Sequence, residues 1–292
     1  MLWMTTAAKV YDEVMQKGDP RVADWFMMSS PVPSFLICLV YMVITKVGPI
    51  FMANRKPFEI RNVMLVYNIA MVLLSAYILE EFISSGWFAG YSIRCQPVDY
   101  SRSTQAMRMA AACWWFYFSK FIELFDTIFF ILRKKLNQVS FLHVFHHGIM
   151  PVSWWFGVKF VPGGFGTFHA MLNSFIHLVM YVYYGLSAAG PNFKKYLWWK
   201  RYMTSLQITQ FIFVFIHASQ LLFIPCNYPK VFAYWIALYA VIFLILFSDY
   251  FHKTYRSKPK VATCQESRTG ISTQKTSNLN GVVGNNIEKK SK

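Results

Sequence analysis

Charged side chains are scarce in this sequence, and acidic ones are the scarcest. Asp, Glu, Lys and Arg together make up 14% of the 292 residues, whereas a soluble globular domain carries about a quarter. Instead, 55% of the residues are hydrophobic and 19% are aromatic. The apolar residues gather in runs of about twenty, the length that crosses a lipid bilayer. The composition excludes a water-soluble fold and predicts an integral membrane protein.

Two common features of secreted chains are also missing. Residues 1–33 hold polar and acidic groups but no sustained apolar core, so we expect no cleavable signal peptide. The first transmembrane helix would then direct insertion. No Asn-x-Ser/Thr sequon occurs, so glycosylation marks no lumenal loop.

The apolar runs predict an all-α bundle of seven transmembrane helices. The expected spans are 34–53, 63–83, 110–132, 141–157, 168–188, 205–224 and 232–251. Pro151 is expected to shorten the fourth span or kink it.

The loop charges support an odd number of spans. The connections 54–62, 133–140 and 189–204 hold ten Lys and Arg residues, and the three alternating connections hold four. The positive-inside rule then predicts a lumenal N-terminus and a cytosolic C-terminus. This distribution attributes the formal charge of +16 to topology and anionic lipid rather than to nucleic acid.

The predicted topology assigns roles to the remaining segments. Cys95 and Cys226 both fall in expected lumenal loops, where oxidising conditions permit a disulfide. We expect residues 1–33 to be lumenal, residues 34–256 to form the transmembrane domain, and residues 257–292 to be a disordered cytosolic tail. The tail ends in a dilysine pattern typical of retrieval to the endoplasmic reticulum, formed by Lys289 and Lys290.

Histidines within an expected span mark a candidate site. The segment HVFHH places His143, His146 and His147 at positions i, i+3 and i+4, on one face of a helix. Ionisable residues inside membrane spans are costly and indicate function. Three imidazoles so arranged are suited to metal binding, proton transfer or nucleophilic attack.

The preceding span adds charged residues at a spacing of three. Lys120, Glu123 and Asp126 would share one helix face. They are interpreted either as an internal ion pair that neutralises buried charge or as carboxylates that fix a histidine tautomer.

Polar residues in the later spans complete the candidate set. Asn173 lies four residues before His177, where its amide is suited to hold a thioester or enolate oxygen. Tyr181 and Tyr184 continue the stripe as a tunnel wall or as packing. In the sixth span, Gln207 and Gln210 either contact substrate or join helices. His169, His217 and His252 are expected to be structural or exposed.

Together these segments resemble the fatty acid elongases, and vertebrate types 7 and 1 are the most similar members. The resemblance rests on KFIELFDT, QVSFLHVFHH, NSFIHLVMYVYY and TSLQITQ in this order, and it runs from about residue 19 to about residue 256. It implies a seven-helix bundle in the endoplasmic reticulum membrane with a narrow acyl-chain pocket. It also implies condensation of an acyl-CoA with malonyl-CoA, which yields 3-oxoacyl-CoA, CoA and carbon dioxide.

The resemblance assigns roles to the candidate residues. His146 or His177 would carry the acyl group, because no cysteine lies close to the histidines in the sequence, and Cys113 near the start of the third span is a distant alternative. His143 and His147 would position groups and move protons, Asp126 or Glu123 would orient an imidazole, and Asn173 would stabilise an oxyanion. Lys120, Tyr181, Tyr184, Gln207 and Gln210 are candidate substrate contacts. The cations expected to receive CoA are Arg133, Lys134, Lys135, Lys200 and Arg201.

The expected ligands are acyl-CoA, malonyl-CoA and membrane lipid, with no resident cofactor and no metal. Partners would be other enzymes of the elongation cycle, or a second copy of the chain. One alternative is a di-iron desaturase or hydroxylase, which uses similar histidine boxes. It requires more histidines than the seven present. The other alternative is a non-catalytic lipid-binding membrane protein, and it does not explain ionisable residues in three successive spans.

Overall fold

The computed structural model describes residues 2–256, with side chains described from residue 9. Within this range every regular element is a helix. The long helices are α1 (Leu2–Gln16), α2 (Val32–Met52), α3 (Arg61–Phe82), α4 (Thr104–Ile122), α5 (Leu124–Leu132), α6 (Phe141–Phe160), α7 (Thr167–Ala188), α8 (Lys200–Ser219) and α9 (Lys230–Phe251). The short ones are η1 (Ile83–Trp87), η2 (Leu136–Gln138), η3 (Gly164–Gly166), η4 (Pro191–Tyr196), η5 (Gln220–Leu222) and η6 (His252–Arg256).

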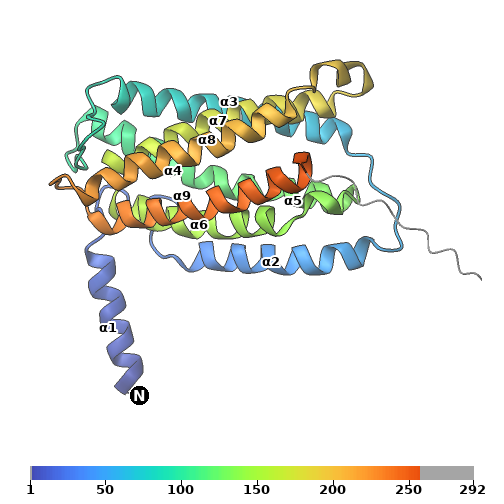
Figure 1. Ribbon diagram of the computed structural model, residues 1–292. Coiled ribbons are helices and arrows are strands. Elements are labelled where there is room, and N and C mark those ends of the chain that lie inside the picture. The colour runs from blue at the N-terminus through green and yellow to red at the C-terminus, as the bar shows by residue number, and fades with distance from the viewer. Residues whose placement is uncertain (1, 257–292) are drawn as a thin grey trace, which may run out of the picture. The chain divides into compact units, whose positions relative to one another are not determined.

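The helices from α2 to α9 run lengthwise beside one another (Figure 1). The most extensive contacts join α3 to α7 and α8 to α9, and α6 packs on both α2 and α4. Four stretches are long and apolar enough to cross a membrane, namely Val32–Met52, Arg61–Trp87, Lys200–Leu222 and Lys230–Arg256. Large apolar side chains such as Leu39, Val66 and Ile245 are exposed on them, as lipid-facing residues are. The protein is therefore an all-α membrane protein, with the more polar α4, α6 and α7 as its interior.

Two expectations about the helices need correction. Pro151 does not shorten its helix, because α6 continues through it to Phe160. The proline removes only one backbone donor there. The expected span 110–132 is interrupted, because α4 ends at Ile122 and α5 begins at Leu124. Glu123 occupies the break between them.

The aromatic core lies where α3, α4 and α6 meet. It includes Phe82, Phe116 and Trp154, and the rings of Phe116 and Trp154 are 4.5 Å apart. The segment before α2 contributes to this core as well, because the indole of Trp155 donates to the carbonyl of Met27 (2.8 Å). Residues from about 19 onward are therefore built into the bundle rather than forming a separate segment.

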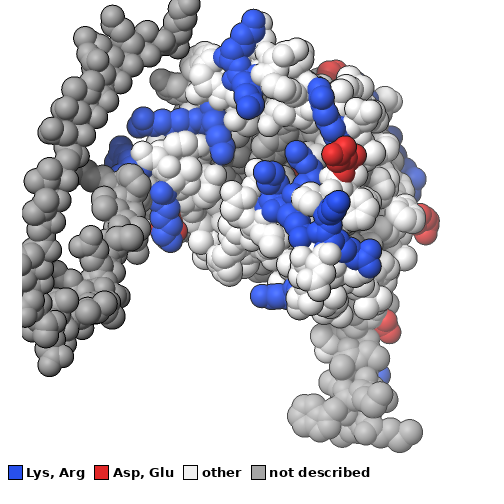
Figure 2. All heavy atoms as spheres, turned by 90° about the vertical axis from the view of Figure 1, so that its right-hand side faces the viewer, with Lys and Arg blue, Asp and Glu red and all other residues white. Residues whose placement is uncertain are grey.

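A basic surface covers one end of the bundle (Figure 2). The connections that end α2, α5 and α7 meet there. Lys134 donates to the carbonyl of Ala53 (2.8 Å), and Arg61 donates to the carbonyls of Ala188 and Ala189. These are the connections in which the sequence concentrates Lys and Arg. In the folded protein, most of the loop cations therefore lie at one end of the bundle.

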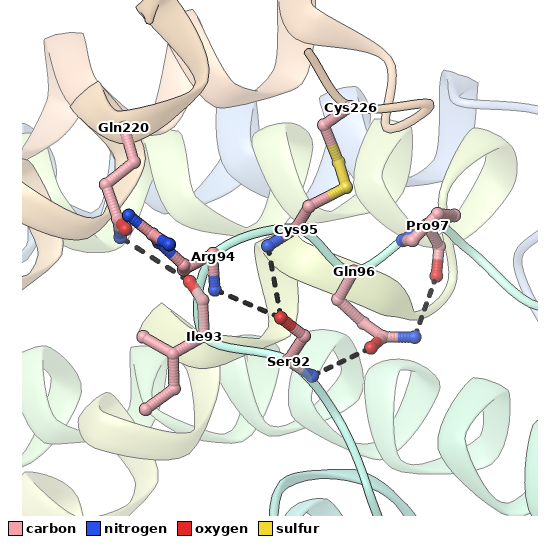
Figure 3. Close-up of a disulfide and its surroundings, with 8 residues drawn as sticks. All are labelled: Ser92, Ile93, Arg94, Cys95, Gln96, Pro97, Gln220 and Cys226. Carbon is pink, nitrogen blue, oxygen red and sulfur yellow. Dashed lines mark hydrogen bonds between the residues drawn. A yellow bond between two sulfur atoms is a disulfide. The ribbon is translucent and has the colours of Figure 1, made fainter. Parts of the chain in front are cut away.

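A disulfide closes the opposite end. Cys95 and Cys226, expected to pair from their loop positions, are joined in the structure (Figure 3). Two further bonds hold the Cys95 loop in place. Gln220 donates to the carbonyl of Ile93 (3.5 Å), and the N–H of Phe165 donates to the carbonyl of Gln96 (2.7 Å). The bridge therefore ties the loop before α4 to the connection between α8 and α9.

We predict that Cys95→Ser raises the number of free thiols per denatured chain by one. The substitution removes one cysteine of the pair and releases Cys226. Titration with a thiol reagent under denaturing, non-reducing conditions measures the change, and Cys38→Ser is the control, because buried Cys38 is free and its loss lowers the number by one. A number that stays the same or falls in Cys95→Ser contradicts the pairing.

Candidate active site

The histidine cluster begins at a capped helix terminus. Ser140 has an extended backbone, and its hydroxyl accepts a hydrogen bond from the N–H of His143 (3.3 Å), an N-cap that starts α6. One helical turn then brings the imidazoles together. The ring of His147 lies 4.3 Å from that of His143 and 5.1 Å from that of His146.

A hydroxyl pair fixes the orientation of His143. Its Nε2 lies 2.7 Å from Oγ1 of Thr127 in α5, and that hydroxyl lies 3.0 Å from the hydroxyl of Tyr41 in α2. Thr127 and Tyr41 are both buried. α2 and α5 therefore help to hold this imidazole of α6.

A buried ion pair of Lys120 and Glu123 lies beside His177 of α7. At the break between α4 and α5, Oε1 of Glu123 lies 2.7 Å from Nζ of Lys120 and 3.1 Å from Nδ1 of His177. The His177 contact is not aligned as a hydrogen bond, and neither Nδ1 of His177 nor Oε2 of Glu123 has a hydrogen-bond partner. The Glu123 carboxylate therefore places negative charge beside His177, where such a carboxylate can orient an imidazole and raise its basicity.

The same lysine orients the amide of Asn173. Nζ of Lys120 donates to Oδ1 of Asn173 (3.2 Å) and lies 4.1 Å from the centre of the Phe116 ring. An ammonium has only donors, so it selects the oxygen of the amide. The Asn173 NH₂ group is thereby left free to donate elsewhere.

Asp126 has a different partner from the one expected. Its carboxylate accepts a hydrogen bond from the hydroxyl of Tyr181 (2.8 Å). Like Lys120 and Glu123, Asp126 is buried. Of the two carboxylates named as candidates to orient an imidazole, Glu123 is the one beside a histidine ring, and Asp126 bonds to a tyrosine.

A cavity of about 470 Å³ opens beside these groups. Its walls come from the ends of α5 and α6 and from α7, α8 and α9. Lys200, Asn137 and Thr254 line it toward the basic end, whereas Gln210 and Phe211 line it deeper in the bundle. The cavity thus joins polar groups near the basic surface to the buried histidines.

The cavity collects most of the expected catalytic residues. Those that line it are Asp126, His143, His146, His147, Asn173 and His177. Glu123 does not line it and acts through its contact with His177.

The expected substrate contacts divide into two groups. Tyr184, Gln207, Gln210 and Lys200 line the cavity, whereas Lys120, Tyr181, Arg133, Lys134, Lys135 and Arg201 do not. Lys120 and Tyr181 are fully buried, and their polar groups serve Glu123 and Asp126. Arg133 contacts the sulfur of Met64 (3.3 Å), and the guanidinium of Arg201 lies 5.6 Å from the Phe251 ring.

Other lining residues were not expected from the sequence. They are Phe130, Asn137, Gln138, Ser140, Leu142, Ile176, Met180, Tyr183, Ser187, Met203, Phe211, Phe247, Tyr250 and Thr254. Most are apolar or aromatic and carry no signal that separates a cavity wall from core packing. Ser140 is an exception, because a serine directly before an apolar helix is a recognisable N-cap.

Within residues 2–256, no group of three His, Cys, Asp or Glu side chains is arranged to hold a metal ion. Of the three histidines of α6, His143 bonds to Thr127, and the ring of His146 packs against those of His147 and Phe243.

Comparison with known proteins decides the family. The model of the ELO family, described as GNS1/SUR4, matches residues 26–263. The chain belongs to the ELO family. This ELO protein is 53% identical over 262 residues to very long chain fatty acid elongase 7 of Rattus norvegicus. The matched region covers 89% of this chain and 93% of the relative. It is 52% identical over 256 residues to very long chain fatty acid elongase 1 of Homo sapiens, covering 86% and 91%.

An insect relative extends the comparison. A very long chain fatty acid elongase of Aedes aegypti is 56% identical over 254 residues, which cover 86% of this chain and 71% of the relative. The ELO match includes every helix that lines the cavity. The resemblance first seen in four motifs is therefore confirmed along most of the chain, and this ELO protein is related to enzymes of fatty acid elongation.

Proposed function

We propose that this protein condenses a long-chain acyl-CoA with malonyl-CoA to give 3-oxoacyl-CoA, CoA and carbon dioxide. The observation that carries the proposal is the cavity of about 470 Å³ that joins a lysine near the basic surface to four histidines and an amide in the membrane interior. A polar mouth suits the CoA moiety, and the apolar walls beyond it suit an acyl chain. Family membership supports the same conclusion.

The first half-reaction transfers the acyl group to an imidazole. A neutral nitrogen of His146 or His177 attacks the thioester carbon, the C–S bond breaks, and the departing CoA thiolate takes up a proton. The Glu123 carboxylate beside His177 stabilises positive charge on that ring. No cysteine lines the cavity among the residues described, which supports an imidazole as the nucleophile.

The second half-reaction forms the new carbon–carbon bond. Malonyl-CoA loses carbon dioxide, and the electron pair of the broken bond forms an enolate. The enolate carbon attacks the acyl carbon, and the imidazole leaves. The free NH₂ group of Asn173, aimed by Lys120, stabilises the oxyanion that develops. His143 and His147 position the reacting groups and move protons.

We propose the following setting for this reaction. The seven long helical segments from α2 to α9, with α4 and α5 as one, cross the endoplasmic reticulum membrane within residues 34–256, and the basic end faces the cytosol. Residues 1–33 start on the lumenal side, and the tail 257–292 is cytosolic. The predicted retrieval signal, Lys289 and Lys290, lies outside the described residues. No cofactor is needed, and the partners are membrane lipid, other elongation-cycle enzymes or a second copy.

Purified protein in detergent tests the proposal. It is incubated with labelled malonyl-CoA and a series of acyl-CoAs, without reductant. We expect a 3-oxoacyl product two carbons longer than the acyl-CoA, with one carbon dioxide released per product. Folded protein that forms no product from any acyl-CoA would favour a non-catalytic lipid-binding relative.

We predict that Lys200→Ala raises the KM for acyl-CoA a few-fold and leaves kcat nearly unchanged. Lys200 lines the cavity and is placed to contact CoA phosphate, and a solvent-exposed charge pair contributes about 1 kcal/mol or less. Steady-state kinetics measure the change. The matched control is Lys134→Ala, because Lys134 donates to the carbonyl of Ala53 and does not line the cavity. Equal effects of the two substitutions contradict a specific role for Lys200.

A further inference from the structure

A second, smaller cavity lies in the membrane interior. Its volume is about 50 Å³, and residues of α6, α9, the start of α7 and the adjoining loops line it. Met150, Trp154, Phe232 and Ile236 give it mainly apolar walls. Several polar groups of its wall are bonded within the protein. The hydroxyls of Ser153 and Tyr239 bond to each other (2.6 Å), the Thr167 hydroxyl donates to the carbonyl of Gly164 (2.7 Å), and Nδ1 of His169 lies 2.6 Å from the carbonyl oxygen of Gly166. The cavity therefore offers little to a polar ligand and suits a short hydrocarbon segment.

The two cavities follow one another along the same pair of helices. On α6, His146 and His147 line the large cavity, and Met150 and Ser153 line the small one. At 1.5 Å per residue, His147 and Ser153 are about 9 Å apart along the helix axis. On α9 the order is the same, with Phe247 in the large cavity and Tyr239 in the small one.

The ring of Phe243 stands between the cavities. It is buried, with 3% of its surface exposed. Its centre lies 5.0 Å from that of His146 and 5.7 Å from that of Phe211, which both line the large cavity. It lies 5.9 Å from that of Tyr239, which lines the small one. Phe243 lines neither cavity and touches the walls of both.

We propose that the small cavity receives the distal end of the longest acyl chains and that Phe243 closes the passage to it. The inference rests on the proposed function, because the chain that reaches Phe243 is the one held at the histidines. The small cavity alone is too small for a separate lipid, yet it adds room for a short terminal segment of a chain that already fills the large one. A lipid tail from the bilayer has the same chemistry, and chain-length dependence distinguishes the two sources.

The test compares the wild type with Phe243→Ala on a graded series of saturated acyl-CoAs. We expect the longest acyl-CoA that is elongated to increase by one or more two-carbon steps. For chains that reach the small cavity, kcat/KM should rise by about four-fold for each additional buried methylene. Because Phe243 also packs against His146, the rate with each longer acyl-CoA is expressed relative to the rate of the same variant with a short acyl-CoA. The matched control is Ile245→Ala on the same helix, because Ile245 is 63% exposed and its loss should not change the profile.

A refilling variant makes the test specific. Gly157 lines the small cavity, and an added Cβ there would meet only ring carbons of Trp154, at 3.5 and 3.8 Å. The double variant Phe243→Ala/Gly157→Leu should return the chain-length profile to that of the wild type. A bilayer lipid tail in the small cavity predicts no such dependence on acyl-CoA length.

Two outcomes overturn the inference. In the first, Phe243→Ala elongates the same range of acyl-chain lengths as the wild type; Phe243→Leu replaces it if the alanine variant does not fold. In the second, Phe243→Ala extends the range but adding Gly157→Leu does not reverse the extension. Thermal stabilisation of the protein by each acyl-CoA is measured alongside, so the shift in preferred chain length can be read without turnover. A wild type that forms no product contradicts the proposed function instead, whereas active variants with an unchanged profile contradict only the role of Phe243.

Discussion

His177→Ala should lower the rate of condensation on the order of 10³-fold or more, because it removes a candidate nucleophile that the protein supports with a buried carboxylate. His146→Ala should lower it to a similar extent if the two imidazoles act as one unit, and the double variant should then be little worse than either single one. Rates of product formation with labelled malonyl-CoA measure all three.

The controls separate chemistry from folding. His217 is also a buried histidine, and it stacks on Phe165 and Phe168 outside the large cavity. His217→Phe keeps a ring in that stack and should retain most of the activity. Full activity in the His146→Ala/His177→Ala double variant would rule out both residues as carriers of the acyl group.

Lys120→Met should destabilise the protein by about 3–5 kcal/mol, because it leaves the buried carboxylate of Glu123 without its ion-pair partner. The double variant Lys120→Met/Glu123→Gln removes both charges and should recover most of this loss. Thermal unfolding of the detergent-solubilised variants, analysed as a double-mutant cycle, measures the coupling between the two residues.

Recovered stability should not bring recovered activity. In the double variant nothing aims the Asn173 amide and no carboxylate lies beside His177, so we expect a loss of about 10²-fold in kcat, the cost of one oxyanion donor. KM for acyl-CoA should change little, because Lys120 does not line the cavity. Lys159→Met is the control for a buried lysine outside this site. A stable double variant with normal kcat would assign the pair a purely structural role.

The sequence alone predicted most helix positions and the membrane setting. The expected span 34–53 is the helix Val32–Met52, and 232–251 is Lys230–Phe251, because long apolar runs leave little choice of structure. The break at Glu123 escaped prediction, because no glycine or proline marks it in the sequence. Pro151 was also misread, since surrounding packing lets a membrane helix continue past a proline.

The sequence predicted which residues form the candidate site better than it predicted which residues they contact. HVFHH and NSFIH identify the imidazoles and the amide because ionisable groups in apolar spans are conspicuous. The pairing of His143 with Thr127 and of Asp126 with Tyr181 depends on how separate helices rotate against each other, which no local pattern encodes. The sequence offered Lys120 both as a partner in an internal ion pair and as a substrate contact. The structure shows the ion pair with Glu123, and the bond to Asn173 is visible only in the packed structure.

The most direct test of the account is the mass of the protein after incubation with an acyl-CoA alone. We predict one acyl group per active chain, located on His146 or His177 by peptide mapping, with an equal amount of CoA released. A chase with malonyl-CoA should then remove the acyl group as 3-oxoacyl-CoA. A protein that forms product from both substrates together, but that never carries an acyl group or carries it on another residue, would contradict the role assigned to these histidines.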